Sequence, residues 1–315
     1  MKVKRVVYDC HSHTYLCGHA ESILPRVYHA VANAQQMRGI AFCCHNPFLK
    51  DDVTSEYRMP FKDFESFLNL YKSEKLYAVD KFPELDLTLH MEVDYHPEDP
   101  SKTKQFVDLC GDFDCLLGSL HYYHETSQVK PEQRVTFIKN YVNTWKQAVQ
   151  TGWFNIMSHY DFFKARFGMD WYLENMSEYQ DDLLDGLSFL AETNKQRLLD
   201  GLQPISLECN TGGIQYGSDL YLPTASILEQ AVTRNIPITL GSDCHDSLEV
   251  GRKFENALTD LQKMGLSKLS YYKRKKMRTY SVQEAIDSFK TINVKEVVDK
   301  FKLKNDCYVE CDSYY

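Results

Sequence analysis

Two histidines near the start of this sequence stand one residue apart and directly follow a short apolar run. Residues 9–13 read Asp-Cys-His-Ser-His. In an extended segment, residues two apart point to the same side about 6.5–7 Å from each other, so the imidazoles of His11 and His13 can reach one metal ion. Neutral imidazole together with carboxylate suits zinc, manganese or ferrous iron. The pair alone is a weak signal, and its weight depends on what the rest of the chain brings to it.

Six further apolar runs end in the same kinds of side chain. A single histidine in such a place is more often a hydrogen-bonding loop residue than a ligand. The repetition at seven successive runs favours a metal site, and one bridging carboxylate would let two ions lie about 3.5–4 Å apart. The candidate ligands beyond the first pair are His19, His45, Glu92, His121, His159, Asp243 and His245, with Asp9, Asp94, Glu208 and Asn210 beside them.

The elements that must position these residues alternate along the chain. We expect strands at 3–9, 40–45, 86–93, 113–121, 154–159, 205–210 and 237–243, and helices near 22–38, 61–79, 98–110, 131–151, 175–200, 223–235 and 249–265. Seven such units allow a closed parallel barrel or an open doubly wound sheet. A closed barrel brings all its strand ends together at one face, so the ligand pattern favours closure. No glycine-rich nucleotide loop follows the first strand.

Composition limits the class of protein. The 315 residues are 43% hydrophobic and 25% charged, which is typical of a globular fold, and the net charge is −8. An acidic chain is a poor candidate for binding nucleic acid or an anionic membrane, but a small phosphate-bearing substrate responds to the local field. We find no signal peptide and no apolar stretch long enough to span a membrane. The ten cysteines are scattered, which predicts free thiols and a cytoplasmic protein.

The motifs around these residues resemble the PHP (polymerase and histidinol phosphatase) superfamily, and within it the bacterial histidinol-phosphate phosphatases of the stand-alone type. The matching stretches occur in family order and read DCHSHTYLCGHAES, AFCCHNPF, MEVDYHP, LLGSLHYY, SHYDFF, LECNTGG and GSDCHD. The resemblance implies an α/β fold, a distorted (β/α)7 TIM-like barrel over residues 1–280 with a metal site at the C-terminal ends of its strands. Residues 281–315 would form a C-terminal extension, to which we assign no role.

The resemblance also implies three divalent ions, which could be Zn, Mn or Fe. The first ion would be held by His11, His13, Glu92 and Asp243. Glu92 would bridge to a second ion held by His121 and His159, and a third ion would take His19, His45 and His245.

The implied reaction is the hydrolysis of L-histidinol phosphate by a hydroxide that bridges two of the metals. Asp243 would orient this hydroxide or take its proton, and Glu92 and His245 complete the implied catalytic set. The predicted substrate-binding residues are Lys164, Arg166, Asn210, Glu208 and Gln215.

Two positions depart from the family pattern. Gln215 stands where an arginine commonly grips phosphate, and Cys44 precedes His45 where an acidic residue is frequent. The first departure keeps open an alternative, a phosphoesterase of the same family that acts on another small phosphate ester or a nucleotide. A non-catalytic barrel and a proofreading nuclease are disfavoured, and the oligomeric state is not predicted.

Other histidines and one basic run are open to more than one interpretation. We expect His29 to be structural, whereas His90 could share a face with Glu92, and His96 and His124 lie in loops where a substrate role is possible. The run YYKRKKMR at 271–278 indicates an exposed barrel edge, with a basic docking patch as the alternative.

Overall fold

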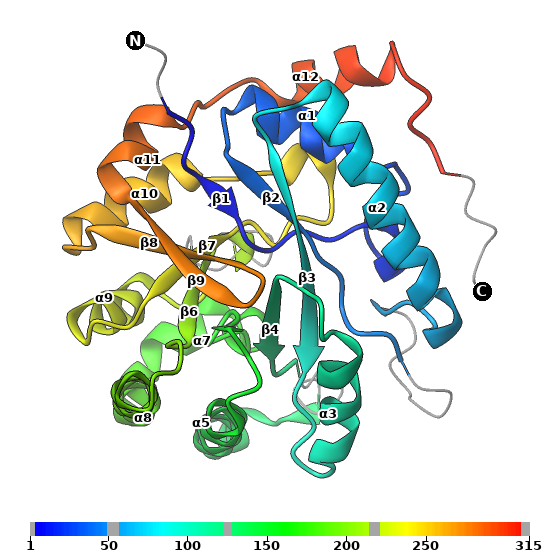
Figure 1. The fold of residues 1–315 in the computed structure, drawn as a ribbon. Helices are drawn as coiled ribbons and strands as arrows, with labels where there is room; N and C mark the ends of the chain where they lie inside the picture. The colour runs from blue at the N-terminus through cyan, green and yellow to red at the C-terminus, as the bar shows by residue number, and fades with distance from the viewer. Residues whose placement is uncertain (1–3, 49–56, 122–127, 214–220, 310–315) are drawn as a thin grey trace.

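Seven parallel strands wind in chain order around the centre of the molecule (Figure 1). The computed structural model describes residues 4–48, 57–121, 128–213 and 221–309. Each strand pairs with the next, and the first and last are joined where the amide of Cys10 donates to the carbonyl of Leu240 at 2.9 Å. The predicted (β/α)7 barrel is therefore confirmed. The strands are β1 (Tyr8–Asp9), β2 (Gly39–Phe42), β3 (Asp86–Asp94), β4 (Cys115–Ser119), β5 (Ile156–Met157), β6 (Ser206–Asn210) and β7 (Ile238–Gly241).

Helices follow the strands on the outside of this barrel (Figure 1). Those after β1–β4 and β6–β7 lie where helical periodicity predicts them. The stretch after β5 also holds two short helices, α6 and α7, that periodicity missed. The helices are α1 (Arg26–Ala34), α2 (Phe64–Lys81), α3 (Pro100–Leu109), α5 (Arg134–Thr151), α6 (Lys164–Phe167), α7 (Met169–Glu174), α8 (Gln180–Leu199), α9 (Ala225–Thr233), α10 (Phe254–Lys263), α11 (Val282–Ser288) and α12 (Val294–Lys302).

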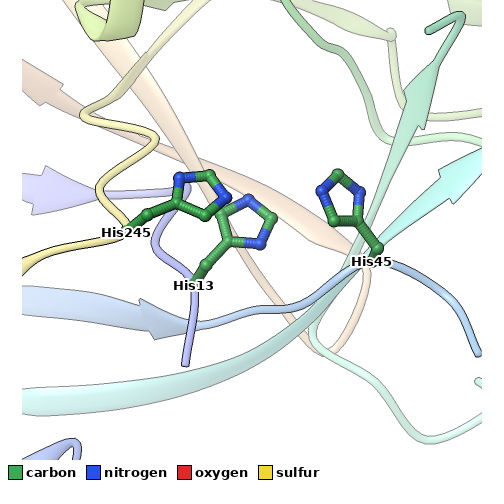
Figure 2. A group of neighbouring side chains, drawn as sticks. All are labelled: His13, His45 and His245. Atoms are coloured by element: carbon green, nitrogen blue, oxygen red, sulfur yellow. The ribbon is translucent and has the colours of Figure 1, made fainter. Parts of the chain in front are cut away.

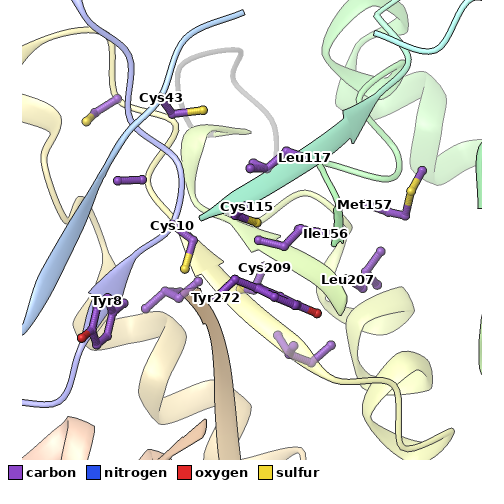
Figure 3. Packing of buried hydrophobic residues seen from close by; sticks show 14 of the residues in the cluster. Tyr8, Cys10, Cys43, Cys115, Leu117, Ile156, Met157, Leu207, Cys209 and Tyr272 are labelled. Atoms are coloured by element: carbon purple, nitrogen blue, oxygen red, sulfur yellow. The ribbon is translucent and has the colours of Figure 1, made fainter. Parts of the chain in front are cut away.

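The core of the barrel is apolar below its ligand-bearing end. Parallel strands covered on both faces read as continuous apolar runs, and all residues of β2, β4, β6 and β7 are buried. Figure 3 shows Cys10, Cys115 and Cys209 packed with Ile156 and the ring of Tyr272. All nine cysteines in the described ranges are free and buried, as their scattered spacing predicts.

A two-stranded hairpin covers the N-terminal ends of the barrel strands. It consists of β8 (Lys268–Lys273) and β9 (Lys276–Ser281), which pair antiparallel. The hydroxyl of Tyr272 donates to the carbonyl of Pro204 at 3.0 Å and lies 2.9 Å from the hydroxyl of Ser206. The ring of Tyr271 stacks on that of Tyr8 at 3.9 Å between centroids. Part of the basic run thus packs against the barrel, which corrects the expectation of an exposed edge.

The turn of this hairpin explains why the sequence pattern does not reveal it. Arg274 and Lys275 both have positive φ, at 52° and 58°. Two-residue hairpin turns of this shape usually carry Asn-Gly or Asp-Gly, and that signal is absent here. Asp114 stabilises the turn instead, because its side chain and its carbonyl accept the amides of Arg274 and Lys275 at 2.7 and 2.8 Å.

The last helix, α12, packs against α1 on the outside of the barrel (Figure 1). The division at residue 280 remains a prediction. Within the described ranges, no helix is both long and apolar enough to cross a membrane.

Candidate metal centre

The C-terminal ends of all seven barrel strands deliver histidines and carboxylates to one buried cluster. The order of the strands explains this convergence, since parallel barrel strands end at the same face. His11 and His13 follow β1, His45 follows β2, Glu92 lies in β3, His121 follows β4, His159 follows β5, Glu208 lies in β6, and Asp243 and His245 follow β7.

Glu92 is the centre of the cluster. Its side chain is only 1% exposed, and ring nitrogens of five histidines surround its two oxygens. Such convergence on one carboxylate is the arrangement expected of a ligand shared between metal ions. The distances to Oε1 are 2.8 Å from His159 and 3.2 Å from His121, and those to Oε2 are 2.9 Å from His45, 3.2 Å from His11 and 3.4 Å from His13.

Asp243 completes a second corner with the His-x-His pair. Its Oδ1 lies 3.1 Å from Nε2 of His13 and 3.5 Å from Nε2 of His11, and these two nitrogens are 3.0 Å apart. Asp243 has a φ of 51°, and its amide donates to the carbonyl of His11 at 2.8 Å. The strained backbone therefore turns the carboxylate toward the pair, as functional sites often do.

A third corner lies at the outer side of the cluster. Figure 2 shows the ring of His13 between those of His245 and His45. The ring of His245 stacks on that of His13 with 4.0 Å between centroids, and the exposed ring of His19 lies 4.3 Å from that of His245. The side chain of His245 is 21% exposed, whereas His11 and His13 are fully buried. His19 and His245 therefore lie where the cluster opens toward solvent.

Most protonation states in the cluster suit metal binding. His11 differs: burial opposes its protonation, but the carboxylates of Asp243, Glu208 and Glu92 raise its pKa well above the usual range. Burial lowers the pKa of His13 to about 3, and it also lowers the pKa values of His45 and His245 below the usual range. Burial opposes ionisation of Glu92 and Asp243, but the neighbouring imidazoles outweigh it and hold both carboxyl pKa values well below normal. Neutral imidazoles and ionised carboxylates are the forms that bind metal.

Second partners direct the ring nitrogens toward the centre. In four of the histidines Nδ1 is used for such a contact, which leaves Nε2 for the cluster. These contacts join His11 to Oε1 of Glu208 at 2.8 Å, His121 to Oδ1 of Asp94 at 2.6 Å, His13 to Sγ of Cys17 at 3.1 Å and His245 to the carbonyl of Asp243 at 3.0 Å.

Sequence reasoning missed a buried arginine beside His121. The Arg58 guanidinium pairs with the carboxylate of Asp94 and donates to Oδ1 of Asn46 at 2.8 Å. Arg58 is only 6% exposed. It therefore holds Asp94 as the carboxylate that orients His121. Arg58 does not follow a barrel strand. Cys17 lies in the loop after β1, but the strand-end pattern sought histidines and carboxylates and so did not select it.

The donor set fits divalent metal ions. The cluster contains three groups of three residues, and within each group the ligand atoms all lie within 4.8 Å of one another. Among the described residues, Oε2 of Glu92, Nδ1 of His45 and Nε2 of His245 are buried without a hydrogen-bond partner, although the first two lie 2.9 Å apart. Such atoms are costly unless a cation binds them. The groups are His11, His13 and Asp243; His45, Glu92 and His121; and His13, His45 and His245.

These groups differ in part from the predicted division into three ion sites. The first group matches the predicted set apart from Glu92. His45 was assigned to the outer ion with His19 and His245, but it also lies beside Glu92 and His121. Its position between the second and third corners explains both groupings.

Two predicted substrate residues from β6 have other partners. Glu208 is fully buried, with Oε1 at His11 and Oε2 accepting the amide of His159 at 3.1 Å. Asn210 donates to Oε2 of Glu208 and to Oδ2 of Asp243, both at 3.1 Å. Both side chains thus hold the ligands of the cluster in place, and their role in substrate binding stays a prediction.

The predicted phosphate-binding cations are not brought together at the cluster. Lys164 is fully buried, and its ammonium donates to the carbonyl of Tyr221 at 2.5 Å and to the hydroxyl of Thr224 at 2.7 Å, with Asp161 at 3.3 Å. These contacts hold Lys164 within the fold, and its role in binding phosphate stays a prediction. Arg166 is exposed on the same short helix, α6, and Gln215 lies outside the described residues.

The remaining histidines divide as follows. His29 is structural as expected, buried in α1 with Nδ1 at 3.5 Å from Glu74. His90 is buried and donates from Nδ1 to the carbonyl of Cys10 at 2.9 Å, so it lies below the cluster. The amide of His96 donates to Thr103 at 2.9 Å, and His124 lies outside the described residues.

The fold and the cluster define a (β/α)7 barrel with a candidate metal centre at the C-terminal ends of its strands. The family model of the PHP domain matches residues 9–195, and the chain belongs to that family. A curated relative from Deinococcus radiodurans, named "Probable histidinol-phosphatase", is 28% identical over 279 residues, which are 85% of this chain and 97% of the relative.

Two solved structures share the fold. HisK from Listeria monocytogenes has a TM-score of 0.66 at 18% identity, and the match covers 79% of this chain and 99% of that one. The histidinol phosphate phosphatase of Lactococcus lactis, solved with zinc, L-histidinol and phosphate, has a TM-score of 0.64 at 20% identity. That match covers 87% of this chain and 99% of the other.

Proposed function

We propose that this chain is a metal-dependent phosphomonoesterase that hydrolyses L-histidinol phosphate to L-histidinol and phosphate, a step of histidine biosynthesis. The observation that carries the proposal is the buried Glu92 carboxylate with five imidazoles around it. The names of the Deinococcus relative and of the Lactococcus structure supply the substrate class.

We assign three divalent ions to the cluster. Zinc is the first choice, and manganese and iron also suit imidazole and carboxylate ligands. When bound, such ions polarise phosphoryl oxygens and lower the pKa of a coordinated water. The three sets are His11, His13, Glu92 and Asp243; Glu92, His121 and His159; and His19, His45 and His245.

The residues of the chain have separate tasks in this reaction. Asp243 is ionised and held at Oδ2 by Asn210, so its Oδ1 can orient the attacking water and accept its proton. Glu92 balances the positive charge of the ions, and Glu208 fixes His11. His245 lies at the outer corner, where the substrate enters. Arg166 remains our candidate for a phosphate contact.

A phosphate-release assay tests the proposal. We expect the zinc-loaded protein to hydrolyse L-histidinol phosphate with a kcat/KM at least about 100-fold above that for p-nitrophenyl phosphate, because a specific site binds the whole substrate in the transition state. Equal rates on the two esters would contradict the substrate assignment and favour a phosphoesterase with another small substrate. No release from either ester after loading with zinc, manganese or iron would contradict the activity.

A further inference from the structure

The loop that carries His19 is supported by the C-terminal end of the chain rather than by a barrel strand. Beyond His19, the amide of Glu21 donates to the carbonyl of His245 at 2.7 Å. The hydroxyl of Tyr28 donates to the same carbonyl at 3.0 Å. One backbone oxygen thus ties the loop after β1 to the loop after β7, and these two loops hold the outer corner of the cluster.

The carboxylate of Glu21 joins three segments. Oε2 accepts the amide and the hydroxyl of Ser247, at 3.0 and 2.8 Å. Oε1 accepts the ammonium of Lys302, the last residue of α12, at 2.7 Å. The side chains of Glu21 and Lys302 are only 24% and 19% exposed. A partly buried ion pair with further hydrogen bonds holds its partners more firmly than an exposed pair.

The chain beyond α12 continues this support. The amide of Leu24 donates to the carbonyl of Cys307 at 2.8 Å, and the amide of Val309 donates to the carbonyl of Ser22 at 3.2 Å. Ile23 and Tyr308 form an antiparallel bridge. Residues 302–309 therefore lie along residues 21–24, immediately after His19.

The inner ligands do not depend on this contact. His11, His121 and His159 follow paired strands and have contacts to Glu208, Asp94 and Glu92. His19 is exposed, and its Nδ1 contacts only the nearby carbonyl of Cys17, at 3.0 Å, among the bonds that the structure describes for its side chain. Apart from contacts with the rings of His13, His45 and His245, the position of its ring is therefore set by its loop.

We infer that the C-terminal segment 294–309 is a positioning element, in which Lys302 acts through Glu21 to hold His19 and His245 in register for the outermost metal ion. This inference rests on the proposed metal centre. It gives the C-terminal extension a role that the barrel motifs do not contain, since these motifs end near residue 246.

The test compares two lysines of the same helix. Lys302→Met removes the ammonium from Glu21 and keeps most of the side-chain volume. Lys300→Met is the matched control, because Lys300 is exposed and pairs with Glu296 one turn away. Zinc stoichiometry is measured by elemental analysis after equilibration against buffered free zinc, together with phosphate release from L-histidinol phosphate and the thermal midpoint.

We expect Lys302→Met to lower the zinc affinity of one of the three sites by about tenfold or more. This is the usual effect of losing a group that orients a ligand. Its kcat should fall at limiting zinc and recover with excess zinc, a recovery that a general loss of stability would not produce. Lys302→Arg should retain the third ion, and Lys300→Met should match the unchanged protein in all measurements.

Unchanged zinc affinity at every site in Lys302→Met would overturn the inference. If this variant does not fold, Ser247→Ala makes the same comparison, because it removes the 2.8 Å bond to Glu21 from the other loop. If the wild-type protein binds no metal, or releases no phosphate when loaded with zinc, that result would instead contradict the proposed function.

Discussion

Glu92 illustrates how much a single residue organises in this protein. Ring nitrogens of five histidines lie within 3.4 Å of its two oxygens taken together. No other carboxylate among the described residues has five such neighbours. The flanking hydroxyl of Ser119 donates to Oε1 at 2.7 Å. In the proposed metal centre no neutral side chain can replace this charge, because the ions that would share it repel one another.

We therefore expect Glu92→Gln to lower kcat by at least about 100-fold and to lose at least one bound ion. Phosphate release and elemental analysis of the purified variant measure the two effects. Glu98→Gln is the control, since Glu98 is exposed just beyond β3. Full zinc occupancy together with full activity in Glu92→Gln would refute the shared-ligand role.

His29 permits a test of burial that does not involve the metal centre. Burial, assisted by the charge of Arg26, lowers the pKa of His29 to about 3. Between pH 6.5 and 3 the unfolded chain binds a proton that the folded chain does not. The stability from this group is thus fully present above pH 6.5 and is lost as the pH falls toward 3.

When the pH falls from 7.5 to 5.5, the free energy of unfolding of the wild-type protein should decrease by about 1 kcal/mol more than that of His29→Gln. Urea denaturation of both proteins in a chelator measures this difference, and the chelator removes any contribution from bound metal. Equal losses in the two proteins would show that His29 titrates normally in the folded state.

At the scale of elements, β7 must approach β6 and β1 closely to bring the ligands together. A Cβ atom at Gly241 would lie 2.1 Å from Oε1 of Glu208 and 2.9 Å from Cβ of His11. Neither contact is tolerable, and relief would move the carboxylate that orients His11. The absence of a side chain at this strand end is thus a condition for the geometry of the centre.

Gly241→Ala should lower the free energy of unfolding by about 1–3 kcal/mol and weaken zinc binding about tenfold. Gly111→Ala provides the comparison, because its new Cβ would meet nothing closer than the Asp108 carbonyl at 3.6 Å. Denaturant titration and zinc competition with a chromogenic chelator measure the two effects. A Gly241→Ala protein as stable and as metal-avid as Gly111→Ala would disprove the steric argument.

The elements also show what the sequence could and could not predict. Apolar runs and strand-end residues located the seven strands and brought His11, Glu92 and Asp243 to one place, because both signals are local. The residues that orient the ligands come from other segments. Arg58 precedes α2 and Lys302 ends α12, so their contacts depend on how loops fold back, which no local pattern records.

The hairpin was missed for a related reason. Its turn residues, Arg274 and Lys275, lack the usual turn signature. Its buried Tyr272 forms a hydrogen bond with Ser206, which lies 66 residues earlier in the chain. Lys164 is predicted to bind substrate because a lysine after a ligand motif looks available for phosphate. Only the fold shows that Asp161 and Thr224 occupy it.

At the scale of the whole molecule, the net charge of −8 says little about the centre. Its carboxylates fall into two kinds. Asp94 is paired with Arg58, and Glu208 with His11, within the protein itself. Glu92 and Asp243 face one another across the imidazoles, so in the proposed metal centre their charge would balance that of the cations.

Removing the metal should therefore destabilise the entire barrel, because the centre joins the ends of all its strands. An ion present at 100 times its dissociation constant stabilises the folded state by about 2.7 kcal/mol, and each kcal/mol raises the thermal midpoint by about 1.5 °C in a chain of this size. Chelation should thus lower the midpoint by about 4 °C per tightly bound ion.

Calorimetry with and without a chelator, followed by addition of zinc, measures this shift and its reversal. Glu92→Gln should show a much smaller shift, since part of the binding free energy is already absent. A midpoint that does not move when the chelator is added to the zinc-loaded protein would contradict the conclusion, because ions at the strand ends would then be contributing nothing to the closure of the barrel. A full shift in Glu92→Gln would place the stabilising ions away from this carboxylate.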